Sequence, residues 1–333
     1  MTSDGTAAAP RRRRLIESGT GSIAGAFGPV EWGLLAATAL IWGSSFLLIE
    51  IGLRSFRPGV VAMLRVLLGV SALALFKAAR KPVNRDDLPR VALLGIVWIG
   101  LPMILFPLAQ RLISSSVAGM INGAVPLMAA GWSVILLRRL PGRTQMLGLA
   151  VGFLGIAAIS WPEVQGSRAT ALGVALVVLA VLFYGLAVNI AVPLQQRYGA
   201  LPVLLRAQLT ALLVVVPFGL WSLPGSTWSW GSATAMIPLG VLGTGVAFVM
   251  MTTLVGRVGP SRGSVAIFFV PVVAILLGVT LLGERVTPGA AAGTGLVLLG
   301  AWLTSRREKV AAATADSTFD IRHSTLGVSE NAD

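Results

Sequence analysis

Two arginines, Arg65 and Arg206, lie within long apolar stretches of the sequence, where an ionisable side chain is unusual. Arg65 lies about 6 residues, roughly 9 Å along a helix, from the end of its stretch, and Arg206 has a similar depth from the opposite end of a later one. Because a charge within an apolar span is costly, each is a functional candidate by default. Snorkelling of the long side chain towards lipid headgroups is the competing explanation.

Polar residues at similar depths are candidate partners for these arginines. We expect Glu50, near the end of the preceding stretch, to pair with Arg65, and Asn189 to face Arg206 or Gln208. These groups would lie near opposite ends of the molecule, and the competing interpretation is a static pair that joins two helices.

Catalytic chemistry is difficult to build from the remaining residues. The chain has no cysteine, which excludes thiolate chemistry, disulfides and cysteine metal sites, and its single histidine, His323, lies close to the C-terminus. The acidic residues fall at the ends of apolar stretches or in loops, where they form no paired general acid and base. We therefore expect neither an enzyme nor a cofactor or metal site.

The elements that position these residues are membrane helices. Mean hydropathy is +0.84, 55% of residues are apolar and only 12% are charged. A bilayer core of about 30 Å needs roughly 20 apolar residues per helix, and runs near this length recur along the chain. The ten predicted spans are Trp32–Leu53, Gly59–Phe76, Val91–Gln110, Ser115–Leu137, Gln145–Trp161, Ala171–Pro193, Leu201–Leu223, Ala235–Leu254, Gly263–Leu282 and Gly289–Thr304.

Basic residues indicate the orientation of these spans. Alternate connections hold most of them, among them Arg11–Arg14, Lys77–Lys81 and Arg138–Arg143, while the opposite connections hold Arg54, Arg57, Arg111, Arg168 and Arg285. The positive-inside rule then places both termini in the cytoplasm. The net charge of +13 is dispersed over loops rather than gathered into a groove-sized stripe, which argues against nucleic-acid binding. Residues 1–30 and 305–333 are expected to be disordered cytoplasmic tails.

The chain repeats itself at a fixed offset of 145 positions. The recurring residues are glycine, serine and proline, in the pairs Gly95 and Gly240, Gly100 and Gly245, Ser116 and Ser261, Pro126 and Pro271, Gly148 and Gly293, and Gly155 and Gly300. Because each copy holds five spans, an odd number, the second copy must be inverted in the membrane. Inverted repeats are typical of secondary transporters, in which the halves rock around a site near the midplane.

Several motifs resemble the EamA family of the drug/metabolite transporter superfamily. They are Trp42-Gly43-Ser44-Ser45-Phe46, Arg65, Pro126 and Gly283-Glu284-Arg285. The resemblance implies ten helices in two inverted five-helix repeats, residues 31–161 and 171–304, around a central cavity, and the export or exchange of amino acids, other metabolites or drugs. One motif departs from the family pattern, because Arg138-Arg139 stands where many relatives have glycine and glutamate at the end of the fourth helix.

Aromatic and polar side chains near the midplane are the candidates for contact with substrate. They are Trp42, Ser44, Ser45, Asn122, Trp132 and Tyr184. Hydrogen bonding between helices, without any ligand, is the competing interpretation for the serines and Asn122, and packing is the favoured one for Trp132. The sparse polarity favours a small amphipathic or zwitterionic substrate. Glu50, Arg65, Asn189, Arg206 and Gln208 then become candidate gating or coupling residues at the two mouths.

The sequence thus predicts a multi-pass transporter of the plasma (inner) membrane that exports or exchanges small metabolites by alternating access. A multidrug/proton antiporter is the alternative, with Glu50 as its coupling residue. A channel or a membrane scaffold is a less favoured interpretation. The expected partners are a small-molecule substrate, the lipid bilayer and, for the alternative, a proton.

Overall fold

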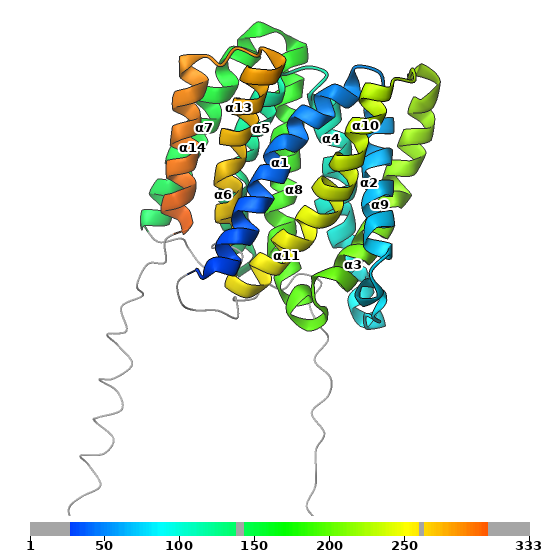
Figure 1. Cartoon of the computed structure of the whole chain (residues 1–333). Coiled ribbons are helices and arrows are strands. Elements are labelled where there is room, and N and C mark those ends of the chain that lie inside the picture. The colour runs from blue at the N-terminus through cyan, green and yellow to red at the C-terminus, as the bar shows by residue number, and fades with distance from the viewer. Residues whose placement is uncertain (1–26, 138–142, 260–262, 306–333) are drawn as a thin grey trace, which may run out of the picture.

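The structure is a computed structural model that describes residues 27–137, 143–259 and 263–305 (Figure 1). The described residues form helices and connections and contain no strand. The helices are α1 (Pro29–Leu53), α2 (Pro58–Ala74), α3 (Leu88–Leu94), α4 (Leu101–Ala109), α5 (Ser115–Asn122), α6 (Val125–Leu137), α7 (Arg143–Gly166), α8 (Arg168–Tyr198), α9 (Ala200–Ser222), α10 (Trp230–Pro238), α11 (Ala247–Val258), α13 (Val270–Leu282) and α14 (Pro288–Ser305). Short 3-10 turns are η1 (Lys77–Arg80), η2 (Arg85–Asp87), η4 (Leu223–Gly225) and η6 (Ser264–Phe269).

Each predicted span overlaps an apolar helical segment. Six segments are long and apolar enough to cross a membrane: Pro29–Leu53, Arg85–Ala109, Ser115–Leu136, Arg168–Tyr198, Ala200–Gly225 and Trp230–Val258. The others are shorter apolar helices of 10–17 residues, namely Pro58–Ala74, Met146–Pro162, Ala266–Leu282 and Pro288–Leu303. The prediction of an all-helical membrane protein is confirmed. The sixth predicted span, Ala171–Pro193, corresponds to α8. Helix α8 continues for five residues beyond Pro193, because this proline lies inside the helix without ending it.

Two segments contain π-helix at equivalent positions of the 145-residue offset. The segment η3 (Gly95–Gly100) joins α3 to α4, and η5 (Leu239–Val246) joins α10 to α11. Glycine is needed here because neighbouring backbone approaches closely: a Cβ at Gly95 would lie 2.2 Å from the Ala207 carbonyl oxygen, and one at Gly240 would lie 2.9 Å from that of Arg65. The pair Gly95 and Gly240 therefore marks a π-helical segment that packs closely against a helix of the other half.

Two further segments are interrupted near the paired prolines. The helix formed by α5 and α6 is broken at Gly123 and Ala124, just before Pro126. The helix formed by η6 and α13 changes character at Phe269, just before Val270 and Pro271. Proline lacks the backbone N–H that would continue the helical ladder, which explains why both interruptions fall at these sites.

Helices α7 and α14 lie side by side (Figure 1) and pack through the remaining repeat glycines. A Cβ at Gly155 would lie 2.6 Å from the carbonyl oxygen of Gly293, and one at Gly300 would lie 2.4 Å from the backbone nitrogen of Gly152. Helices α7 and α14, one from each half of the chain, thus meet with small residues at the contact, as is common for helices in membranes.

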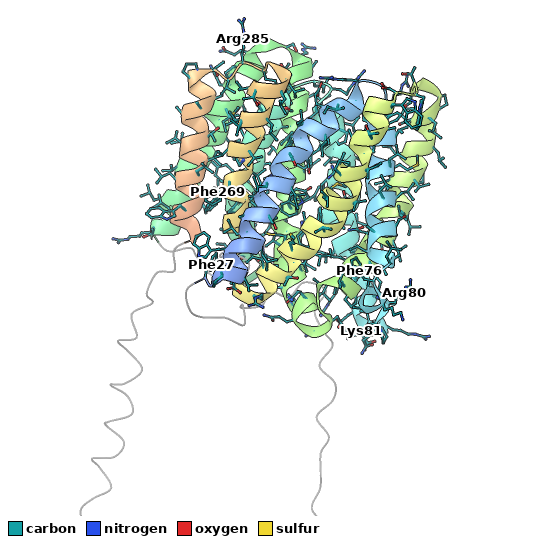
Figure 2. All side chains as sticks on the ribbon, in the orientation of Figure 1. Phe27, Phe76, Arg80, Lys81, Phe269 and Arg285 are labelled. Carbon is teal, nitrogen blue, oxygen red and sulfur yellow. The ribbon has the colours of Figure 1, made fainter. Side chains whose placement is uncertain are left out.

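The two ends of the bundle differ in charge. Phe27, Arg80 and Lys81 lie at one end, here named the basic end, and Arg285 lies at the other, here named the opposite end (Figure 2). Helix α1 begins and α14 ends at the basic end (Figure 1). The predicted tails at residues 1–30 and 305–333, with Arg11–Arg14 and His323, lie almost entirely outside the described residues, and so does Arg138-Arg139.

Candidate functional site

A cavity lies between helices of both halves of the chain. The residues that line it belong to α1, α2, α4 and α5 from the first half and to α8, α11 and η6 from the second. The unfilled space, counted out to its open side, is about 400 Å³. Its lining consists of Trp42, Ser45, Phe46, Ile49, Arg65, Phe106, Asn122, Tyr184, Phe248 and Ile267.

Arg65 carries the positive charge of this cavity. Its residue is only 3% exposed, and its Nε donates a hydrogen bond to Thr244 Oγ1 at 3.1 Å. Thr244 lies in the π segment η5, where its hydroxyl in turn donates to the Leu239 carbonyl at 3.2 Å. Within the described residues no carboxylate pairs with Arg65, and its terminal guanidinium nitrogens form no hydrogen bond. A buried cation of this kind is unusual without a partner.

Aromatic rings form much of the cavity wall. The Trp42 and Phe248 rings lie 5.1 Å apart, Phe46 and Phe106 lie 5.5 Å apart, and Phe106 and Tyr184 lie 5.6 Å apart. The first pair joins the two halves, and a hydrogen bond of 3.1 Å from Trp42 Nε1 to the Gly243 carbonyl joins them again. The wall therefore offers apolar surface at a place where both halves of the chain meet.

Asn122 contributes an unused hydrogen-bond acceptor. It is the last residue of α5, at the interruption before Pro126, and is 4% exposed. Its side-chain oxygen Oδ1 has no hydrogen-bond partner within the described residues. Buried polar atoms are normally paired, so this oxygen is an unusual unpaired acceptor on a residue that lines the cavity. Ser45, in contrast, donates its hydroxyl to the Ile41 carbonyl at 2.9 Å.

The structure places four of the six predicted cavity residues in the lining, namely Trp42, Ser45, Asn122 and Tyr184. Ser44 lies outside it and donates to the Ile41 carbonyl. Trp132 also lies outside it, and its Nε1 donates to the Leu182 carbonyl at 3.0 Å, which is a packing contact.

Sequence reasoning missed the apolar lining of Phe46, Ile49, Phe106, Phe248 and Ile267. Helical periodicity from Trp42 would have found two of these, since Phe46 and Ile49 follow it by four and seven residues on the same face. No local signal distinguishes Phe106, Phe248 or Ile267 from the many other apolar residues of their segments.

The predicted gating pairs are not formed in this structure. Glu50 is partly buried and forms no ion pair within the described residues, whereas Arg65 turns to Thr244. Arg206 donates to the carbonyls of Ala79 and Pro202 at 3.3 and 3.0 Å.

Gln208 and Asn189 also have other partners. Gln208 Nε2 donates to the Thr244 carbonyl at 2.6 Å, so Gln208 and Arg65 converge on one threonine. Asn189 accepts from the Ser133 hydroxyl at 2.7 Å and donates to the carbonyls of Ala129 and Gly185. The sequence did not indicate Thr244 as a partner of Arg65 and Gln208, because its side chain is a neutral hydroxyl.

Glu284, from the motif Gly283-Glu284-Arg285, closes a contact between the halves at the opposite end. Gly283 adopts φ +66°, which ends α13 and turns the chain towards α5. The Glu284 carboxylate accepts hydrogen bonds from the backbone N–H and hydroxyl of Ser115, at 2.9 and 2.7 Å, and from the same two groups of Ser116. A carboxylate at a helix N-terminus is favoured because the first N–H groups lack intrahelical partners.

Comparison with known proteins agrees with this architecture. The EamA-like transporter family matches the chain twice, at residues 31–161 and 171–306. A solved crystal structure with 16% sequence identity has a TM-score of 0.58 and covers 84% of this chain and 99% of its own, a likeness that concerns the fold alone.

Curated relatives span almost the same length. An uncharacterized transporter of Archaeoglobus fulgidus is 29% identical over 83% of this chain and 99% of its own. A probable terminal-alkyne amino-acid exporter of Streptantibioticus cattleyicolor is 28% identical over 82% of this chain and 92% of its own, and a probable amino-acid metabolite efflux pump of Escherichia coli is 28% identical over 81% and 93%. The resemblance of the sequence motifs is thereby confirmed, and the chain belongs to the EamA-like transporter family.

Proposed function

We propose that this chain is a secondary transporter that exports or exchanges small amphipathic metabolites, amino acids or related compounds, through the cavity around Arg65. The observation that carries the proposal is a buried guanidinium without a carboxylate partner among the described residues, beside an aromatic wall built by both halves. Arg65 would bind an anionic group, the free Asn122 Oδ1 would accept from an N–H group, and the rings would cover the apolar part. The names of two relatives point to the same class of substrate.

The transport mechanism would be alternating access between two inverted repeats, residues 31–161 and 171–304, with five membrane-spanning helices each. Equivalent π segments, equivalent interruptions at Pro126 and Pro271, and the packing of α7 on α14 support this division. We place the basic end in the cytoplasm and the protein in the plasma (inner) membrane. An inner membrane transporter of Escherichia coli is among the relatives, 27% identical over 87% of this chain.

Flux in proteoliposomes tests the site. We expect Arg65→Gln to lower the rate of counterflow of labelled amino acids by at least about tenfold, because the anionic group loses its charged partner. Arg65→Lys should retain part of the rate, and the control Arg168→Gln, at an exposed position, should retain all of it. Unchanged flux in Arg65→Gln would contradict the assignment of the site.

An imposed pH gradient separates the proposed mechanism from proton antiport. Glu50 directly follows the cavity residue Ile49 and is the candidate coupling residue. Equal flux with and without the gradient would remove proton coupling, whereas stimulation that Glu50→Gln abolishes would establish it. Flux without saturation would instead favour a channel, and no flux for any compound would favour a scaffold.

A further inference from the structure

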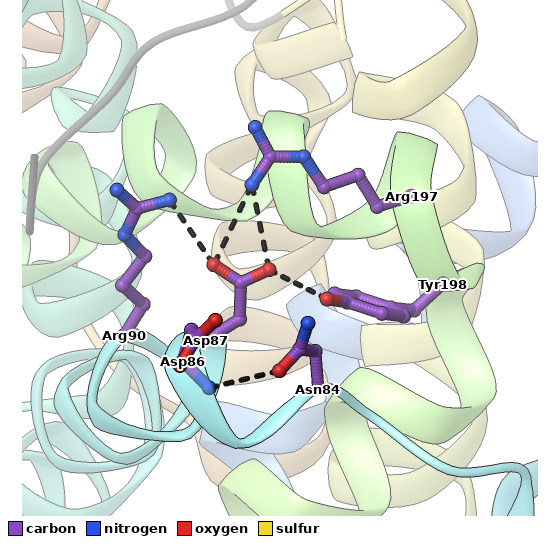
Figure 3. A network of polar contacts seen from close by, with 6 residues as sticks. All are labelled: Asn84, Asp86, Asp87, Arg90, Arg197 and Tyr198. Carbon is purple, nitrogen blue, oxygen red and sulfur yellow. Dashed lines mark hydrogen bonds and ion pairs between the residues drawn. The ribbon is translucent and has the colours of Figure 1, made fainter. Parts of the chain in front are cut away.

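A buried carboxylate joins the two halves at the basic end. Asp87 ends the turn η2, just before α3, and its side chain is 0% exposed (Figure 3). It accepts a hydrogen bond from the Tyr198 hydroxyl at 2.5 Å and pairs with Arg197 at 3.4 Å, both in the last turn of α8. Arg90, from α3, lies 3.2 Å from the same carboxylate. One carboxylate of the first half is thus held by two side chains of the second half.

A second ion pair joins the halves at the same end. Glu31, in the first turn of α1, lies 2.6 Å from a guanidinium nitrogen of Arg257, in the last turn of α11. The Glu31 side chain is 6% exposed and that of Arg257 is 39% exposed. Every ion pair among the described side chains lies at this end.

The repeat offset leads from these charged residues to neutral ones at the opposite end. Asp87, Arg90, Arg197 and Tyr198 correspond to Ser232, Ala235, Gly52 and Leu53, and Glu31 and Arg257 correspond to Leu176 and Leu112.

At the opposite end, residues at or near these positions form neutral contacts. The Ser232 hydroxyl donates to the Ile51 carbonyl at 2.8 Å, and a Cβ at Gly173 would lie 2.9 Å from the Ile113 side chain. The contacts at these positions are therefore charged at the basic end and neutral at the opposite end.

We propose that Asp87 with Arg197 and Tyr198, together with Glu31 and Arg257, is an ionic latch that closes the basic end of the transport path. The inference rests on the proposed alternating access. Opening the basic end requires α3 to leave α8 and α1 to leave α11, which separates charged groups that are largely shielded from water. Opening the opposite end separates the equivalent helices at the cost of neutral contacts. Without substrate, the latch therefore biases the protein towards the state that is open at the opposite end. These residues position the halves and do not touch substrate.

The absence of native cysteine makes the latch directly measurable. Ser45→Cys places a reporter in the cavity, and labelling by a membrane-impermeant maleimide is compared between right-side-out and inside-out vesicles. A separate surface reporter, Lys81→Cys, identifies the vesicles that expose the basic end. We expect Asp87→Asn to raise labelling from the basic end about fivefold and to lower it from the opposite end. Asp86→Asn, at the exposed neighbour, is the matched control and should leave both rates unchanged.

An exchange of charges guards against simple misfolding. Glu31→Arg and Arg257→Glu should each raise labelling from the basic end, and the double variant should restore the original ratio because the ion pair is re-formed with its signs reversed. If the variants lower thermal stability but leave the ratio of the two labelling rates unchanged, the contacts only stabilise the fold. That result would contradict the proposed latch.

Labelling needs no substrate, so the latch can fail on its own. Labelling of the wild-type background from both faces at once, in every molecule, would instead overturn alternating access itself. A ratio that shifts in the variants supports the latch even when the transported compound is still unknown.

Discussion

The two halves of the chain are joined by different chemistry at the basic end and at the opposite end of the bundle. At the basic end, Asp87 and Glu31 pair with arginines of the second half. At the opposite end, the Ser232 hydroxyl meets a backbone carbonyl, and Glu284 meets the N–H and hydroxyl groups of a helix N-terminus. The side chains that close the two ends therefore differ, although glycines and prolines recur at a fixed offset in the two halves of the chain.

Similar backbone geometry in the two halves of the chain can therefore carry contacts of different free energy. In the alternating access proposed above, inverted repeats would give two arrangements related by symmetry, but equal energies would require equal contacts at both mouths. Neutral hydrogen bonds contribute less than those to charged groups, so the two arrangements of this chain are expected to differ in population. The strongest challenge to that ranking comes from two charged contacts between the halves at the opposite end: Glu284 accepts from Ser115 and Ser116, and Arg57 Nε donates to the Gly225 carbonyl at 3.2 Å.

Glu284→Gln has the largest expected effect. The carboxylate accepts from two backbone N–H groups and two hydroxyls, and glutamine would turn an NH2 group towards these donors. We expect the free energy of unfolding, measured by denaturation in mixed micelles, to fall by roughly 2 kcal/mol.

The exposed neighbour Arg285 supplies the control, since Arg285→Gln removes a charge but no hydrogen bond. If Glu284→Gln raises cavity labelling from the opposite end more than Asp87→Asn raises it from the basic end, the opposite end is the more strongly closed one. The comparison between the ends would then be reversed.

Ser232→Ala has a smaller expected effect. It removes the hydrogen bond to the Ile51 carbonyl, worth about 1 kcal/mol, from the position equivalent to Asp87. Cavity labelling from the opposite end should rise by up to about fivefold, with no rise from the basic end. Thr234→Ala removes a hydroxyl that bonds only within α10 and should change neither rate. A rise at the basic end instead would show that Ser232 does not close the opposite mouth.

The elements of this fold were largely predictable from the sequence. Apolar segments follow from hydropathy, and the paired glycines and prolines fall at π segments and interruptions because each has a backbone role at those sites. Arg65 lies in the lining of the cavity, whereas the sequence predicted a position at one of the two mouths.

The partners of these residues were not predictable. Thr244 carries no charge and lies 179 positions from Arg65, so nothing in the sequence links them. Asp87 resembles a solvated residue at the end of a helix, yet it is buried because Arg197 and Tyr198 arrive from a distant helix. The pairs expected from depth alone, Glu50 with Arg65 and Asn189 with Arg206 or Gln208, are not formed in this structure, because each of Arg65, Asn189, Arg206 and Gln208 bonds to another group.

Raising the salt concentration should have the smallest effect and acts on one end only. From 0.1 M to 1 M the screening length falls from about 10 Å to about 3 Å, which weakens pairs with an exposed member such as Arg257. Cavity labelling from the basic end should therefore rise, by less than about twofold, while labelling from the opposite end should not. In Glu31→Gln the pair with Arg257 is already broken, so the part of the salt response that depends on it should disappear. A salt response of equal size at both ends would mean that the charges at the basic end do not distinguish the two mouths.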